Sequence, residues 1–224
     1  MIACEESQRV CYYFRLLGFN AYSCDLSSCS GGFPEWHIKA DCSSLLNGNC
    51  QFVTLDGVTH YVVGKWDMII AFPPCTYLSK AGARWMFPSG QISADRFLKA
   101  EAARDFFNLI LNADCDFIAI ENPVPLKIVS LPKPSQIIQP FLFGEPFSKK
   151  TLLWLKGLPL LIPTNILSNY SPYIPSNTSK FSKGINKGSK GFANTKKDRS
   201  KTFLGVAEAM AFQWGEFLIN NSKK

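Results

Sequence analysis

The chain has 224 residues, 46% of them hydrophobic, and a formal net charge of +7. This length and composition suit one domain with a substantial core. No apolar run approaches the 18 residues of a membrane span and the start lacks a signal-peptide pattern, so the sequence favours a cytoplasmic protein.

The first half of the chain alternates short strands with a helix. We expect a strand at 2–4, a helix at 7–17 with Ser7 as its cap, and further strands at 21–24 and 37–40. Residues 51–63 read as a hairpin. The continuous apolar run at 67–72 predicts a strand that is buried on both faces.

The second half continues the alternation. A long amphipathic helix is expected at 95–112, strands at 117–120, 137–143 and 152–155, and a closing helix at 203–219. Short buried strands alternating with helices predict an α/β fold with a doubly wound, mostly parallel, Rossmann-like sheet. We expect a single domain over residues 1–224.

One segment differs from the rest in composition. Residues 168–194 are rich in Ser, Asn, Gly, Lys and Pro, which predicts a flexible basic insertion over 168–201. From 180 to 201 there are eight basic residues and one acid, whereas the remaining chain is neutral. Such a segment can hold nucleic acid through phosphate contacts, and a solvated loop is the alternative. The expected nucleic-acid contacts here are Lys183, Lys187, Lys190, Lys196 and Lys197.

The eight cysteines are predicted to be thiols. A protein of the cytoplasm rarely carries a disulfide framework, although the even count leaves a secreted, bridged chain open. The chain has no Cys-x2-Cys pair and two histidines, which disfavours a metal site.

Polar and reactive residues follow the predicted strands. In a parallel sheet the carboxyl ends of the strands share one edge, and ligands bind there. We therefore expect these residues to lie on one edge, with the ordinary polarity of strand ends as the alternative. They are Cys4-Glu5-Glu6-Ser7, Asp25, Asp41, Pro73-Pro74-Cys75 and Glu121-Asn122.

The acids point to an adenosine ligand without phosphate. Asp25 is placed to bind ribose hydroxyls and Asp41 to hold an adenine amino group, while ordinary turn capping is the alternative for each. No G-x-G-x-x-G follows the first strand, and the adjacent Glu5 and Glu6 would repel a pyrophosphate. A cationic adenosine cofactor is favoured.

Cys75 is the candidate nucleophile. The two prolines before it fix a stiff, extended approach. A thiol at a sheet edge beside Lys80 and Arg84 could act as a nucleophile, and a space-filling buried cysteine is the alternative.

Two motifs resemble a known family. The stretch FPPCTYLSKAG at 72–82 resembles the catalytic loop of DNA cytosine-5 methyltransferases, and ENPVP at 121–125 resembles their Glu-Asn-Val motif. Together with ACEESQ, PEWHIKAD and RSKTFLGVAEAMAFQWG, they resemble short methyltransferase-like proteins of phages and mobile elements over nearly the whole chain.

The resemblance implies a class I methyltransferase-like fold, S-adenosylmethionine as cofactor and DNA as substrate. Cys75 would attack carbon 6 of a cytosine, Glu121 would bind or protonate ring nitrogen 3, and Asn122 completes the motif. Arg84 and Lys150 would join the lysines of the insertion in contacting DNA. The implied cofactor-binding residues are Cys4, Glu5, Ser7, Asp25, Asp41, Phe72 and Pro73.

The chain also departs from that family. Its glycine-rich cofactor loop is absent, and only the basic insertion stands where full-sized relatives have a large target-recognition domain. Two other interpretations therefore stay open. One is an enzyme of the same scaffold acting on a free nucleotide or RNA, and the other is a non-catalytic nucleotide- or nucleic-acid-binding protein.

Overall fold

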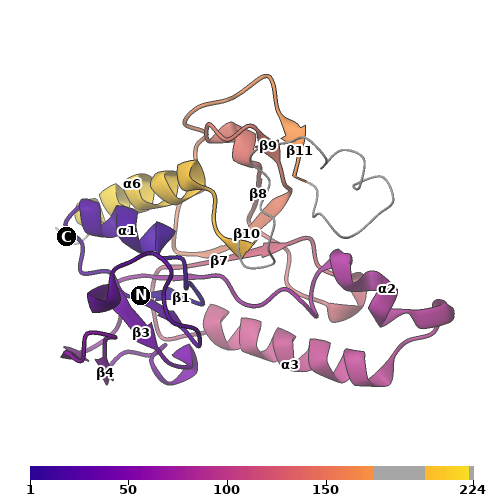
Figure 1. Cartoon of the computed structure of the whole chain (residues 1–224), viewed down its shortest axis with the longest axis horizontal. Coiled ribbons are helices and arrows are strands. Elements are labelled where there is room, and N and C mark those ends of the chain that lie inside the picture. Colours follow the sequence, from indigo (N-terminus) through magenta and orange to yellow (C-terminus); the bar gives the residue numbers. More distant parts are fainter. Residues whose placement is uncertain (174–199, 222–224) are drawn as a thin grey trace.

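The computed structural model describes residues 1–173 and 200–221. Its main feature is a seven-stranded mixed sheet in the order β3-β2-β1-β6-β7-β10-β8 (Figure 1). The first five strands in this order are parallel, and β10 runs antiparallel to both of its neighbours. The predicted α/β class with a mostly parallel core is confirmed. The strands are β1 (Ile2–Ala3), β2 (Ser23–Asp25), β3 (His37–Lys39), β6 (Ile69–Ala71), β7 (Ile118–Pro123), β8 (Gln136–Ile138) and β10 (Thr151–Lys156).

Helices cover both faces of the sheet. Figure 1 shows α1 (Arg9–Leu16) and α6 (Leu204–Asn221) together on one side, and α3 (Ala94–Leu111) on the other. A short helix, α2 (Ala83–Met86), precedes α3.

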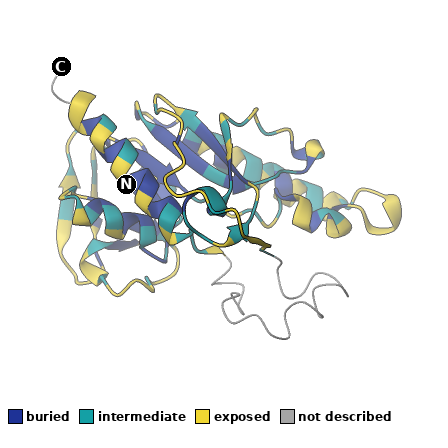
Figure 2. Ribbon diagram, turned by 90° about the horizontal axis from the view of Figure 1, so that it is seen from above, coloured by how far each residue is buried: buried dark blue, intermediate teal, exposed yellow. Residues whose placement is uncertain are grey.

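Alternating side chains along the strands form two separate cores. In β6, Ile69 and Ala71 belong to the apolar cluster that contains Phe107 of α3. Ile70 belongs to the opposite cluster, with Trp214 of α6. This alternation follows from the two-residue period of a strand, and it explains why 67–72 reads as continuously apolar. Figure 2 shows the strands as the buried centre and the helices exposed on their outer sides.

Two predicted elements differ from the structure. The strand expected at 137–143 ends at Ile138, and Pro140 begins a 3-10 turn, because proline has no N–H for a sheet ladder. Helix α1 begins at Arg9 rather than Ser7, and Ser7 does not cap it, since Gln8 at the cap position has a φ of 58°.

Small antiparallel and parallel pairs complete the fold. The predicted hairpin is present as β4 (Cys50–Val53) and β5 (Thr59–Val62). Strand β11 (Ser171–Pro172) pairs with β9 (Phe147–Ser148), so the start of the expected insertion is in part strand rather than loop. The remainder of the insertion up to residue 199 lies outside the described residues.

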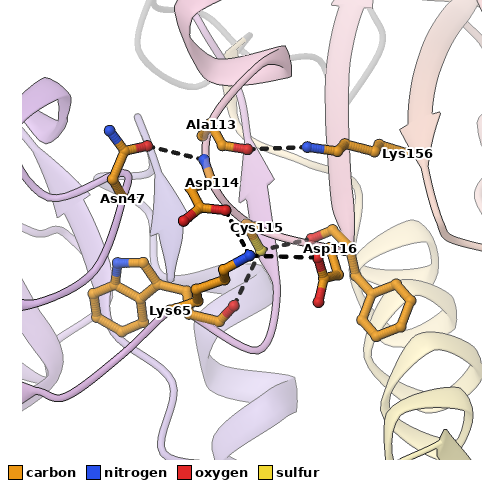
Figure 3. Close-up of polar contacts among 9 residues, drawn as sticks. Asn47, Lys65, Ala113, Asp114, Cys115, Asp116 and Lys156 are labelled. Atoms are coloured by element: carbon orange, nitrogen blue, oxygen red, sulfur yellow. Dashed lines mark hydrogen bonds and ion pairs between the residues drawn. The ribbon is translucent and has the colours of Figure 1, made fainter.

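A polar network braces the edge where β6 and β7 begin (Figure 3). Lys65 Nζ lies 2.6 Å from Asp114 and 3.9 Å from Asp116, and Lys156 Nζ donates to the carbonyl of Ala113 at 3.0 Å. These groups occupy the amino edge of the parallel strands. The residues of the predicted site lie at the opposite, carboxyl edge.

Within residues 1–173 and 200–221, no helix is both long enough and apolar enough to cross a membrane.

Candidate functional site at the carboxyl edge

The sheet register places the predicted site residues on one edge. Ala3 pairs with Cys24, and Ala71 pairs with both Ala3 and Ile120 in parallel. The segments that follow β1, β2, β3 and β6 therefore emerge together, beside the last residues of β7. Because β10 runs in reverse, its start at Lys149–Thr151 reaches the same edge. Cys75, Glu121, Asp25 and Asp41 all belong to this edge.

Asn122 fixes the Cys75 loop to β7. Its side chain is 1% exposed, and Nδ2 donates a hydrogen bond of 2.9 Å to the carbonyl of Pro73. Oδ1 of Asn122 is buried without a hydrogen-bond partner in the described part of the chain. Since Pro73 lies two residues before Cys75, the bond sets the position of the thiol relative to the strand that carries Glu121.

Backbone bonds reinforce this connection further along both loops. The N–H of Leu126 donates to the carbonyl of Leu78 at 2.7 Å, and that of Lys80 donates to Val124 at 3.0 Å. The segments after β6 and after β7 are thus joined by backbone hydrogen bonds, with one N–H donated from each segment. Loops paired in this way keep a fixed separation, which a nucleophile and an acid acting on one ring require.

The Cys75 loop begins as a tight turn. The carbonyl of Cys75 accepts hydrogen bonds from the N–H groups of Leu78 at 3.1 Å and Ser79 at 2.9 Å. Cys75 is partly exposed, and none of the eight cysteines forms a disulfide. The predicted thiol state of the cysteines is confirmed.

Arg96 of α3 braces this turn from outside. Its Nη2 donates to the carbonyl of Thr76 at 2.7 Å, and its guanidinium lies 5.0 Å from the ring centre of Tyr77. Gly82 leaves room for it, because a Cβ there would lie 2.5 Å from Nη2. No sequence motif marks Arg96, so it lies outside the predicted site.

Glu121 lies in a pocket with a cation. The pocket lies between the end of β7, the start of β10 and the start of α6, where Lys149, Thr151 and Phe203 join Glu121 in its lining. Burial raises the pKa of the Glu121 carboxyl, and the charge of Lys149 opposes that shift. A carboxyl held in this way is better able to donate a proton. Of the described residues that line this pocket, none belongs to the Cys75 loop.

Lys149 is a second residue that the sequence analysis missed. Its Nζ lies 5.9 Å from the ring centre of Tyr173 and 5.7 Å from that of Phe203. The basic pair Lys149–Lys150 before a strand marks this position in the sequence, and the prediction names only Lys150. Lys150 is exposed, as is Arg84. The five predicted lysines from 183 to 197 lie outside the described residues.

The end of β1 holds a buried acid. The Glu5 carboxylate accepts hydrogen bonds from the N–H groups of Val10 at 2.7 Å and Cys11 at 3.2 Å, in the first turn of α1. Burial raises its pKa to about 8. A helix N-terminus at this place binds the pyrophosphate in dinucleotide-binding folds. Here the protein's own carboxylate takes that place, which fits a cofactor without phosphate.

Asp25 and Asp41 both form local turns. Asp25 Oδ1 accepts from the N–H of Ser27 at 2.8 Å. Asp41 Oδ1 accepts from the N–H of Ser43 at 2.9 Å and from its hydroxyl at 2.7 Å, and these bonds lower the pKa of Asp41. The capping that the sequence left open is therefore present at each. Each acid uses one oxygen in this way, so a ribose or adenine contact remains compatible.

The other predicted cofactor residues have different surroundings. A hydrogen bond with Cys42, together with burial, raises the pKa of the Cys4 thiol. Phe72 is held to β1 by its N–H, which donates to the carbonyl of Ala3 at 3.0 Å, and Pro73 is buried. Cys4 thus packs against a neighbouring thiol, while Phe72 and Pro73 form the junction between β1 and the Cys75 loop.

A hollow of about 430 Å³ opens beside Ser7. Gln8 Nε2 donates to the carbonyl of Phe33 at 2.7 Å, and the N–H of Phe33 donates to Gln8 Oε1 at 3.1 Å. These two bonds close one wall of the hollow. Ser7 is the one predicted cofactor residue in its lining. Arg9, Tyr12 and Lys201 also line the hollow, and no sequence motif marks them.

No group of three or more His, Cys, Asp and Glu side chains in residues 1–173 and 200–221 is arranged to hold a metal ion. A scan against protein-family models and a search of curated proteins find no match to this chain. What the site can do is therefore inferred from its own residues.

Proposed function

We propose that this protein is an S-adenosylmethionine-dependent methyltransferase that acts on carbon 5 of a cytosine in DNA, with Cys75 as nucleophile. The observation that carries the proposal is the bond between Asn122 and the Pro73 carbonyl, at 2.9 Å. It joins the loop of the nucleophile to the strand of the acid.

The sheet supports the same function. The order β3-β2-β1-β6-β7 corresponds to the 3-2-1-4-5 order of the doubly wound, Rossmann-like fold. Its topological switch point lies between β1 and β6, where ligands bind in such sheets. The segments Cys4–Ser7 and Phe72–Cys75 emerge at this point, so cofactor and nucleophile would meet there.

The cofactor contacts follow from the acids at the edge. S-adenosylmethionine, when bound, supplies an electrophilic methyl group on a sulfonium. Asp25 would hold its ribose, Asp41 its adenine, and Phe72 and Pro73 would separate it from the substrate. The position of the Glu5 carboxylate at the start of α1 favours a ligand without phosphate over a dinucleotide.

Cys75 and Glu121 would divide the chemistry. The Cys75 thiolate forms a bond to carbon 6 of the ring, and the Glu121 carboxyl donates its proton, or a hydrogen bond, to nitrogen 3. This would leave carbon 5 nucleophilic, so it could accept the methyl group that the cofactor would supply, with S-adenosylhomocysteine as the leaving group. A base would then remove the carbon-5 proton, the Cys75 thiolate would leave carbon 6, and the proton on nitrogen 3 would return to Glu121. In duplex DNA the target base has to be flipped out of the helix first.

The test is covalent trapping with a 5-fluorocytosine oligonucleotide and S-adenosylmethionine. Fluorine cannot leave as a proton, so the wild type should accumulate an adduct through Cys75, seen on a denaturing gel and by peptide mass. Cys75→Ser should form none. Glu121→Gln should slow trapping about 100-fold or more, because the proton donor is lost.

Cys29→Ser is the matched control, since Cys29 is another partly exposed thiol. It should trap at the rate of the wild type. The same assay with a 5-fluorocytosine RNA and with the free nucleotide compares the other substrates. If the wild type binds oligonucleotide and cofactor but forms no adduct, the proposed function is wrong.

A further inference from the structure

Trp85 is unlike the other tryptophans of this chain. Its side chain is 57% exposed on the four-residue helix α2. Trp66, Trp154 and Trp214 are buried, and each donates its indole N–H to a backbone carbonyl. Trp36 is partly buried, with its ring stacked on Phe33 at 4.1 Å. Leaving a tryptophan in water forfeits the apolar burial that stabilises the other four.

The surroundings of Trp85 are apolar and cationic together. The guanidinium of Arg84 lies 4.6 Å from the Trp85 ring centre, and the nearby Phe87 and Ile92 are 37% and 55% exposed. We call Arg84, Trp85, Phe87 and Ile92 the α2 patch. Figure 2 shows an exposed loop at the end of the molecule where Figure 1 places α2.

The charge next to the α2 patch is positive. Between Cys75 and Leu98 the chain has three cations and one acid. The acid, Asp95, is paired with Lys99 at 2.8 Å. Lys80 and Arg84 are exposed, and Arg96 extends to the Cys75 turn. Such a surface complements a polyanion.

The α2 patch is continuous with the Cys75 loop. A 3-10 turn over Lys80–Gly82 leads directly into α2, and the N–H of Lys80 is bonded to Val124. Arg96 links the start of α3 back to Thr76. The patch is thus built onto the same braced frame as Cys75, ten residues after it.

We propose that the α2 patch is a stacking platform for an unpaired base of a nucleic-acid strand. The indole of Trp85 stacks on the base, and Arg84 and Lys80 bind the flanking phosphates. Aromatic rings beside arginines hold single strands in this way without reading the sequence. The inference deepens the proposed function and rests on it for one point, that a neighbouring nucleotide enters the Cys75 site. It makes the substrate a polynucleotide strand rather than a free nucleotide.

Tryptophan fluorescence tests the platform directly, because Trp85 is the one strongly exposed indole. Titrating the full-length protein, without cofactor, with an oligothymidine of about 12 nucleotides should quench part of the emission. An abasic strand of the same length should quench little, since it has phosphates but no bases. Trp85→Phe should lose the quenching while retaining most of the affinity.

Trp85→Ala should weaken oligonucleotide binding about 5- to 150-fold, measured by anisotropy of a labelled strand. Arg84→Ala should lower the salt slope of binding by about 0.7. Tyr61→Ala is the matched control: Tyr61 is 70% exposed, on the β5 hairpin, and its loss should leave the affinity unchanged.

Two results would overturn the platform. One is that Trp85→Ala binds the oligonucleotide with wild-type affinity and that the wild-type emission is not quenched. The other is quenching by anionic lipid vesicles, or by a protein partner, but not by oligothymidine. The trapping assay reports separately on the proposed function. Quenching without any adduct would leave the platform standing, and adduct without quenching would leave only the methyltransferase.

Discussion

At the scale of single residues, Glu5 occupies the helix N-terminus where dinucleotide-binding folds place a phosphate. Its carboxylate is bonded to two N–H groups of the first turn of α1. Its carboxyl oxygens thus satisfy helix N–H groups that a bound phosphate would otherwise satisfy. Glu5, which was predicted to contact the cofactor, is therefore part of the scaffold at the start of α1.

Glu5 should make the stability of the protein depend on pH. Burial raises its pKa from 4.5 to about 8 in the folded chain. Between these values the unfolded chain releases a proton that the folded chain retains. The stabilisation present below 4.5 is therefore lost as the pH rises through 8, at up to about 1.4 kcal/mol per pH unit.

We expect Glu5→Gln to remove this slope. Urea unfolding from pH 5.5 to 8.5 should show the wild type losing stability relative to the variant as the pH rises. Glu35→Gln, which changes an exposed carboxylate, should show the same dependence of unfolding free energy on pH as the wild type. Parallel curves for Glu5→Gln as well would contradict the assignment.

At the scale of elements, the connection between α3 and the Cys75 turn predicts a positioning role for Arg96. Arg96→Ala removes the bond to Thr76 and the cover over Tyr77. We expect slower adduct trapping, with the unfolding midpoint nearly unchanged because the bond is exposed. Arg96→Lys should restore part of the rate.

Arg104→Ala is the control on the same helix. Arg104 forms ion pairs with Glu101 and Asp105, both at 3.4 Å, and neither pair involves the Cys75 loop. Its loss should leave trapping at the wild-type rate. Equal slowing by Arg96→Ala and Arg104→Ala would mean that α3 acts through general stability.

Elements with a clear periodic signal could be predicted from the sequence. The apolar run at 67–72 became β6, and the pattern at 95–112 became α3, shifted by one residue. The reversal of β10 could not be predicted, because its direction depends on pairing with β7 and β8, which lie 13 or more residues away in sequence. Local periodicity carries no information on such pairing.

The site was predictable in its motifs but not in its contacts. Pro73, Cys75 and Glu121 stand at strand ends that the sequence marks. The capping of α1 by Glu5 was not visible, because Ser7 is the better capping residue by type. Ser7 does not cap the helix, because Gln8, with a φ of 58°, occupies the cap position.

At the scale of the whole molecule, the net charge of +7 predicts binding to a polyanion. Changing Lys183, Lys187, Lys190, Lys196 and Lys197 together to Gln removes most of the charge that distinguishes this segment. We expect weaker DNA or RNA binding and a flatter salt dependence, by about 0.7 to 0.9 per lost phosphate contact. Lys65→Gln, at the amino edge, should leave the slope unchanged. An unchanged slope in the five-lysine variant would make that segment a spacer.

The aromatic contact above Lys149 has a consequence for how such a protein could evolve. The rings of Tyr173 and Phe203 lie 5.2 Å apart, so residue 173 and the start of α6 are held side by side. The cost of closing a loop grows slowly with its length, by about 0.6 kcal/mol for each doubling. A gene could therefore exchange the coding stretch between these two codons as a cassette. In the proposed methyltransferase, new target preferences would then arise by recombination without any change to the sheet.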